Sequence, residues 1–175
     1  MLDLSGEAPP AVPWSIGRYD EVRGIYTQDL FATDAAARRC VHMGIDLGAP
    51  AGVSVHAFAS GEVVRAGVNG QPGDYGPTLV TAHALDGRRL FVLHGHLSAA
   101  SLSHSPVGRR FERGEVLGWL GTSEENGGWP PHVHVQLAWE CPPTADLPGA
   151  VTLAEREAAR ARYPDPRRIL GPLYR

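Results

Sequence analysis

Short runs of alternating hydrophobic and polar residues make up the middle of the chain. They follow the period of two that places successive side chains on opposite faces of a β-sheet. Glycine, proline and aspartate residues separate the runs at intervals typical of tight turns. The pattern predicts β-strands over 52–59, 61–68, 78–85, 88–97, 109–121 and 132–139. Asp86-Gly87, between the third and the fourth run, is the strongest two-residue hairpin signal in the chain.

One segment near the C-terminus has a helical pattern instead. Residues 152–163 combine helix-forming residues with charges of alternating sign, which is typical of a solvent-exposed helix face. Thr152 and Glu155 have the spacing of a capping box, and Pro164 ends the run. We therefore predict one C-terminal helix.

These patterns divide the chain into three parts. Residues 1–40 predict an irregular N-terminal arm packed on the core, and within it 21–31 fits either a short strand or a packing segment. Residues 41–141 contain the strand pattern, and 142–175 form an extension with the helix. Many short strands joined by tight turns predict an all-β fold with a compact antiparallel sheet or sandwich.

Composition and charge mainly exclude classes of function. A formal net charge of −3 gives no basic surface for nucleic acid and no polybasic patch for a membrane. The first residues lack the basic and apolar regions of a signal peptide, and no run reaches the length of a membrane span. Cys40 and Cys141 form no spaced disulfide framework. We therefore expect a cytoplasmic protein that binds neither nucleic acid nor membrane.

Histidines inside strand patterns are the first candidate for chemistry. His132 and His134 are two residues apart, so their side chains are expected on the same face of a strand. The same spacing predicts that His94 and His96 face together. Either pair alone is short enough to arise by chance, so the argument depends on their combination with other residues.

A third histidine adds a possible metal site. His42 precedes Asp46 by four residues, and Gly44 lets the chain turn so that both side chains can converge. Zn²⁺ in catalytic sites takes three nitrogen or oxygen ligands from the protein and leaves one position for water. Such an ion lowers the pKa of its water from about 15.7 toward about 7. Further histidines then remain for proton transfer or for stabilising an oxyanion.

Taken together, these segments resemble a known family, the lysostaphin/LytM-type zinc metallopeptidases. The resemblance covers about residues 40–140 and rests on five segments in the family's order: "HMGIDLGAPAG", "GEVVRAG", "HGHLS", "RGEVLGWLG" and "PHVHVQ". It implies a compact antiparallel β core with a narrow groove, and cleavage of peptide bonds in bacterial cell-wall cross-links, often next to glycine or D-alanine. Matching positions imply one zinc ion held by His42, Asp46 and His134. They also imply a catalytic pair that does not bind the metal, His96 and His132.

Several positions depart from the family's pattern. Gln136 stands where the family usually has Glu, His94 where Tyr is common, and Pro77 where Asn is usual. Tyr75 and Trp129 lie in loops rich in glycine and proline, which makes them candidates for substrate contact. His94 fits either a groove-lining or a structural role, and we include it among the candidate substrate contacts.

The expected function is zinc-dependent hydrolysis of a peptide bond in a peptidoglycan-type or glycine- or D-alanine-containing peptide. The substrate is then a peptide or muropeptide. "NGGWPPHVHVQ", with later "DLPGA" and "PDP", resembles a branch fused to kinase-like and aminotransferase-like domains, which implies such proteins as working partners. One alternative is a catalytically silent domain of the same fold that binds a partner or substrate. Another is a cupin-like barrel, which leaves "HMGID" without a role.

Overall fold

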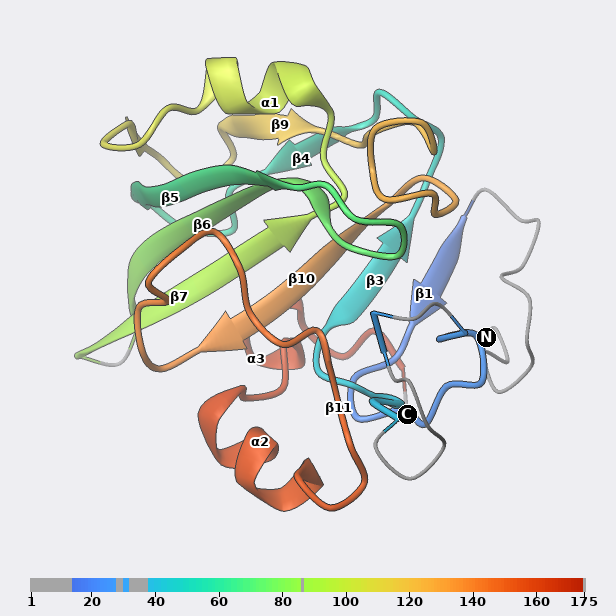
Figure 1. Ribbon diagram of the computed structural model, residues 1–175. Helices are drawn as coiled ribbons and strands as arrows, with labels where there is room; N and C mark the ends of the chain where they lie inside the picture. The colour runs from blue at the N-terminus through green and yellow to red at the C-terminus, as the bar shows by residue number, and fades with distance from the viewer. Residues whose placement is uncertain (1–13, 28–29, 32–37, 86, 175) are drawn as a thin grey trace.

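An antiparallel seven-stranded sheet forms most of the protein. The computed structural model describes residues 14–27, 30–31, 38–85 and 87–174, and Figure 1 shows the arrangement of its elements. Every strand pair in the large sheet is antiparallel. In spatial order its strands are β1 (Ser15–Gly17), β3 (Ile45–Gly48), β10 (His132–Ala138), β7 (Arg88–Gly95), β6 (Gly76–Leu85), β5 (Gly61–Asn69) and β8 (Arg110–Phe111). The predicted all-β class is confirmed.

Two small sheets and three short helices complete the described chain. The small sheets pair β2 (Val41–His42) with β11 (Ala150–Val151), and β4 (Ser54–His56) with β9 (Val116–Trp119). The helices are α1 (Ala99–His104), α2 (Arg156–Arg162) and α3 (Arg167–Leu170). In Figure 1, β4, β9 and α1 lie above the large sheet, and α2 lies below it.

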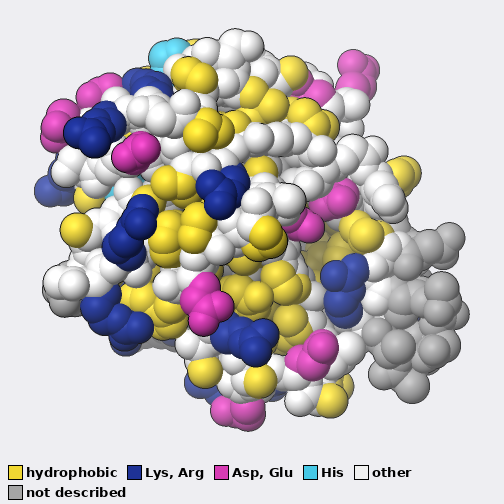
Figure 2. All heavy atoms as spheres, turned by 60° about the vertical axis from the view of Figure 1, so that its left-hand side comes forward, with side chains coloured by type: hydrophobic (Ala, Val, Ile, Leu, Met, Phe, Trp, Pro, Cys, Tyr) yellow, Lys and Arg dark blue, Asp and Glu magenta, His cyan; other side chains and the backbone are white. Residues whose placement is uncertain are grey.

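The surface carries charges of both signs. On the face drawn in Figure 2, arginine and acidic side chains are interspersed with bands of hydrophobic side chains. Among the described residues, none of the helices is long and apolar enough to cross a bilayer.

The hairpin of β6 and β7 follows the sequence prediction closely. Leu85 pairs with Arg88, so the two strands are joined by a two-residue loop. Gly87 has a φ of 75°, a left-handed conformation that suits glycine and the tight turns of hairpins. Asp86, the other predicted turn residue, lies outside the described residues.

The predicted C-terminal helix exists, but it is shorter than expected. α2 begins at Arg156, and Thr152 and Glu155 form the capping box one turn earlier, with Glu155 Oε2 accepting from the Thr152 backbone N–H at 3.0 Å. The two other helices were not predicted. α1 has six residues and buries only Ser101, and α3 has four, so neither is long enough to show a helical period.

The main core lies between the large sheet and the β4–β9 pair. Leu137 on β10 is fully buried in it, and burial of a leucine side chain contributes about 1.5–3 kcal/mol to stability. Other members of this cluster include Val63, Leu79, Leu90, Val92 and Leu117. Because β10 lies in this core between β3 and β7, the side chains on its other face are held in fixed positions.

The N-terminal arm packs along the edge that carries β3. β1 pairs with β3 so that Gly17 lies opposite Asp46, and Val22 forms an isolated bridge with Val41. The described part of 21–31 is therefore a packing segment with one bridge rather than a regular strand. The expectations for 1–13, 28–29 and 32–37 lie outside the described residues.

Candidate metal centre

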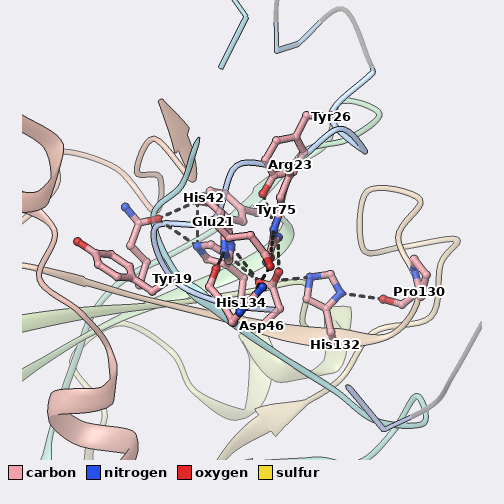
Figure 3. A network of polar contacts seen from close by, with 12 residues as sticks. Tyr19, Glu21, Arg23, Tyr26, His42, Asp46, Tyr75, Pro130, His132 and His134 are labelled. Atoms are coloured by element: carbon pink, nitrogen blue, oxygen red, sulfur yellow. Dashed lines mark hydrogen bonds and ion pairs between the residues drawn. The ribbon is translucent and has the colours of Figure 1, made fainter. Parts of the chain in front are cut away.

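Three side chains from neighbouring strands converge at one end of the large sheet. The register of β10 and β3 places His134 directly opposite Asp46, and β2 brings His42 beside them. One ligand atom of each residue lies within 4.8 Å of the others, and Figure 3 shows the three side chains pointing toward one another. Gly44 makes this possible, because a Cβ at that position would overlap the His134 ring.

The distances among these three atoms fit a tetrahedral metal ion. His42 Nε2 lies 3.0 Å from His134 Nδ1, and His134 Nδ1 lies 2.9 Å from Asp46 Oδ1. The third edge, from His42 Nε2 to Asp46 Oδ1, is 3.3 Å. Ligands about 2.0–2.1 Å from a tetrahedral zinc ion are about 3.3–3.4 Å apart. The three atoms therefore match one face of such a tetrahedron, within a few tenths of an ångström.

The hydrogen bonds on the outer side of both imidazoles fix their tautomers. His42 Nδ1–H donates to the Arg18 carbonyl at 2.8 Å, and His134 Nε2–H donates to Gln136 Oε1 at 3.1 Å. Each ring is thereby left with an unprotonated nitrogen on the inner side. Two nitrogen lone pairs and a carboxylate oxygen face one another, and a cation satisfies all three at once.

The charge states of these groups also suit a metal. Burial lowers the pKa of His42 to about 4, and the charge of Arg23 adds to that shift. Burial alone would raise the pKa of Asp46, but His42 and Arg23 hold that pKa well below its usual range. Metal ligands must be deprotonated, and both groups are in that form at neutral pH.

Two further histidines lie beside the three. His132 Nδ1–H donates to the Pro130 carbonyl at 2.7 Å, and its Nε2 lies 3.8 Å from Asp46 Oδ1. His96 Nδ1–H donates to the Asn126 carbonyl at 2.8 Å, and the His96 and His132 rings are 4.2 Å apart. Burial is the main cause that lowers the pKa of both imidazoles. Both rings are therefore neutral, and the Nε2 atom of each is a proton acceptor.

His94 does not join His96 at this site, so the expectation that the two face together was wrong. His94 pairs with Val135, and its Nε2 lies 3.1 Å from Thr81 Oγ1 in a cavity on the opposite side of the sheet. β7 ends at Gly95, and His96 has a φ of 62°. This left-handed backbone breaks the alternation of the strand and turns the His96 side chain toward the metal centre.

A cavity of about 470 Å³ opens beside the metal centre, and Tyr75 and Trp129 both line it. Tyr75 is only 7% exposed and lies behind His134, where its hydroxyl donates to Gln136 Oε1 at 3.2 Å. This contact helps to fix the position of Gln136 Oε1, which accepts the hydrogen bond from His134 Nε2–H. Trp129 forms part of the cavity wall and packs edge to face on Tyr26, with 6.2 Å between the centroids of the two rings.

Sequence reasoning missed two residues that organise this region. Arg23 donates from Nη1 to the second oxygen of Asp46 at 2.6 Å. Asn126, which is fully buried, bonds the backbone N–H and carbonyl of Trp129 and so fixes the loop that holds His96. The sequence gives no signal for Arg23, since its position depends on how the arm packs.

The comparison with protein families agrees with this geometry. The profile of Peptidase family M23 matches residues 40–145, more than half of the chain, and that range contains all five clustered residues. The chain belongs to peptidase family M23. It is thus a metallopeptidase by family.

Relatives of the M23 domain include much longer proteins. The chain is 34% identical over 96 residues to the DD-carboxypeptidase/endopeptidase Mpg of Neisseria meningitidis serogroup B, and the Mpg protein of Neisseria gonorrhoeae matches it with the same identity over the same length. These matches cover 55% of this chain but only 20% of the relatives, so the chain spans a small part of their length.

Two solved structures show the same fold as the M23 domain. The catalytic domain of lysostaphin from Staphylococcus simulans aligns with a TM-score of 0.54 at 19% identity, covering 90% of this chain and 92% of that one. The catalytic domain of EnpA, a prophage-encoded M23 protein from Enterococcus faecalis, aligns with a TM-score of 0.53 at 20% identity, covering 85% and 94%.

Proposed function

We propose that this chain hydrolyses a peptide bond in a peptidoglycan-type substrate, with one zinc ion held by His42, Asp46 and His134. The observation that carries the proposal is the convergence of two imidazole lone pairs and a carboxylate oxygen at 2.9–3.3 Å from one another. Hydrogen bonding alone cannot satisfy such a set, because the protons of both rings are committed elsewhere.

The donor set fits zinc better than a harder cation. Imidazole nitrogen suits zinc and other late transition metals, whereas Mg²⁺ and Ca²⁺ prefer sites built of oxygen. When bound, zinc would supply Lewis-acid polarisation of the scissile carbonyl and acidification of the attacking water. His42, Asp46 and His134 would hold the ion with three protein ligands, the number typical of catalytic zinc sites, and all three line the cavity.

The two neighbouring histidines supply the proton transfers. His132 Nε2 is unprotonated and lies beside the three ligand atoms, 3.8 Å from Asp46 Oδ1, and we assign it the proton of the water that attacks the carbonyl carbon. His132 then donates this proton to the nitrogen of the leaving amine as the peptide bond breaks. His96 Nε2 is also an acceptor, because its Nδ1–H donates to the Asn126 carbonyl. His96 therefore orients the attacking water by accepting a hydrogen bond from the second hydrogen of that water.

The relatives support the proposed substrate class. The Mpg proteins are DD-carboxypeptidases and endopeptidases, and lysostaphin is an antimicrobial peptidase. A cavity of about 470 Å³ beside the metal centre has room for a short peptide segment. Trp129 in its wall supplies a flat apolar surface for the substrate backbone.

The function is tested with a panel of substrates. The purified protein with one equivalent of zinc is incubated with pentaglycine peptides, D-alanine-containing muropeptides and an all-L peptide, and new amino groups are measured. We expect cleavage in at least one of the first two classes, abolished by a zinc chelator and restored by zinc. Zinc binding without cleavage of any member would instead favour the silent binding domain.

The pH dependence of the reaction follows from His132. Because burial lowers the pKa of His132 below the usual 6.5, the imidazole stays neutral and able to accept a proton down to that lower pH. Activity is therefore expected to persist at pH 6.5 and to fall as the pH decreases below it. The measurement is kcat/KM from pH 4 to 9 for the wild type and for His132→Ala, and an acid limb that is unchanged in the variant would contradict this role.

Two other expectations have no support from the comparisons. The cytoplasmic location stays a prediction. The link to kinase-like and aminotransferase-like proteins likewise stays a prediction.

A further inference from the structure

Asp46 uses its two oxygens for different partners. Oδ1 faces His134 at 2.9 Å, whereas Oδ2 accepts from Arg23 Nη1 at 2.6 Å, as Figure 3 shows. Arg23 is only 3% exposed, and a short charge-assisted hydrogen bond at such a site is strong. Arg23 lies in the N-terminal arm, outside the range that matches family M23.

The arm holds this guanidinium from several sides. Arg23 Nη1 also donates to the Tyr26 hydroxyl at 3.0 Å, and Nε donates to Glu21 Oε2 at 3.2 Å. The Arg23 backbone N–H bonds the Cys40 carbonyl at 2.8 Å, which anchors the segment next to β2. Gly17 leaves room for the guanidinium, because a Cβ there would overlap Arg23 Nη2.

The position of Arg23 is not the one that satisfies all of its donors. Nη2 is buried and has no hydrogen-bond partner among the described residues. A buried donor without a hydrogen-bond partner is unfavourable, and more so when it is charged. The Arg23 side chain therefore keeps the contact with Asp46 at the expense of its own hydrogen bonding.

We propose that Arg23 is a positioning residue that fixes Asp46 as a single-oxygen ligand of the metal, so that the N-terminal arm is part of the metal centre. This inference rests on the proposed zinc site. With Oδ2 held by the guanidinium, Oδ1 would be the one oxygen of Asp46 that is available to the ion. Glu21 holds the arginine from the other side, since its Oε2 lies 3.2 Å from Arg23 Nε while its Oε1 lies 3.1 Å from Arg18 Nε.

The test compares metal binding in Arg23→Met, Arg23→Lys and wild type by competition with a zinc chelator. Removal of a residue that orients a metal ligand typically weakens metal affinity by about 10–100-fold, and we expect that loss for Arg23→Met. The zinc affinity of Arg23→Lys, in which an ammonium group replaces the planar guanidinium, is expected to lie between those of Arg23→Met and the wild type. The Co²⁺-substituted Arg23→Met protein should absorb more weakly in the visible range, because Asp46 then binds through both oxygens and raises the coordination number.

A matched control uses an arginine of α2 that binds the arm away from the metal centre. Arg156 forms an ion pair with Asp20, from Nε to Oδ1 at 2.7 Å, without contacting the metal centre. Arg156→Met should therefore keep zinc affinity and the Co²⁺ spectrum of wild type. If Arg23→Met does not fold, as judged by circular dichroism, Arg23→Lys carries the test, since it keeps the positive charge but removes the planar guanidinium that contacts Asp46.

The outcomes separate this inference from the proposed function. Wild-type protein that binds no zinc would overturn both. Zinc-binding wild type with a folded Arg23→Met variant of equal affinity and an unchanged Co²⁺ spectrum would overturn only the role of Arg23.

Discussion

Replacing His134 by alanine is expected to remove zinc binding and peptide hydrolysis together. His134 is the central member of the three, because its Nδ1 lies 3.0 Å from His42 Nε2 and 2.9 Å from Asp46 Oδ1. Removal of a residue that only hydrogen-bonds a metal ligand typically weakens metal affinity by about 10–100-fold. Because His134 is a ligand in the proposed site, we expect its removal to lower zinc affinity by more than about 100-fold. The metal contributes several kcal/mol to the transition state, so hydrolysis should fall by about 1000-fold or more. The measurements are zinc content after dialysis and the rate of amine release.

His94→Ala is the matched control for this variant. His94 is also a buried histidine of the large sheet, 5% exposed, but its side chain lies in the cavity on the opposite side. The same substitution there should leave zinc content and cleavage near wild type, after correction for any loss of stability. Equal zinc in the wild-type and His134→Ala proteins would show that the metal is held elsewhere.

Replacing His132 by alanine is expected to separate catalysis from metal binding. His132 Nε2 lies beside the metal centre but is 3.8 Å from Asp46 Oδ1, too far for a hydrogen bond in the absence of water. A positioned general base contributes about 10²–10⁴-fold to a rate, and we expect kcat to fall by this factor. Zinc content should stay at one ion per chain. The measurement is kcat and KM with zinc content determined on the same sample.

The comparison with His96→Ala identifies the base. His96 Nδ1–H donates to the Asn126 carbonyl, and the His96 ring lies 4.2 Å from the His132 ring. In the proposed mechanism His96 orients the water and His132 takes its proton. A smaller loss of kcat is therefore expected for His96→Ala than for His132→Ala. The reverse order would exchange the two roles. Loss of zinc in His132→Ala would contradict the separation of ligand from base.

Local sequence patterns predicted the elements that carry the site. The alternation in 132–139 predicted β10, which spans His132–Ala138, and correctly placed His132 and His134 on one face. The two-residue loop between β6 and β7 followed from its turn residues. Both features depend on neighbouring residues only, which is why a single sequence is sufficient to predict them.

Features that depend on tertiary packing could not be predicted in this way. The side chain of His96 turns to the metal centre because its backbone is left-handed, and alternation alone would have sent it elsewhere. Arg23 meets Asp46 across 23 positions of sequence, through an arm that has no regular period. The positions of Gln136 and Tyr75 behind His134 likewise follow from strand register and from the close approach of Tyr75 to Gly95 and Gly149.

X-ray absorption at the zinc edge of the purified holoprotein tests the central claim most directly. The account predicts one zinc ion per chain, with about four nitrogen and oxygen donors at about 2.0–2.1 Å, including the imidazoles of His42 and His134. A sulfur donor at about 2.3 Å, such as Cys40 would supply, or the absence of tightly bound zinc, would contradict it.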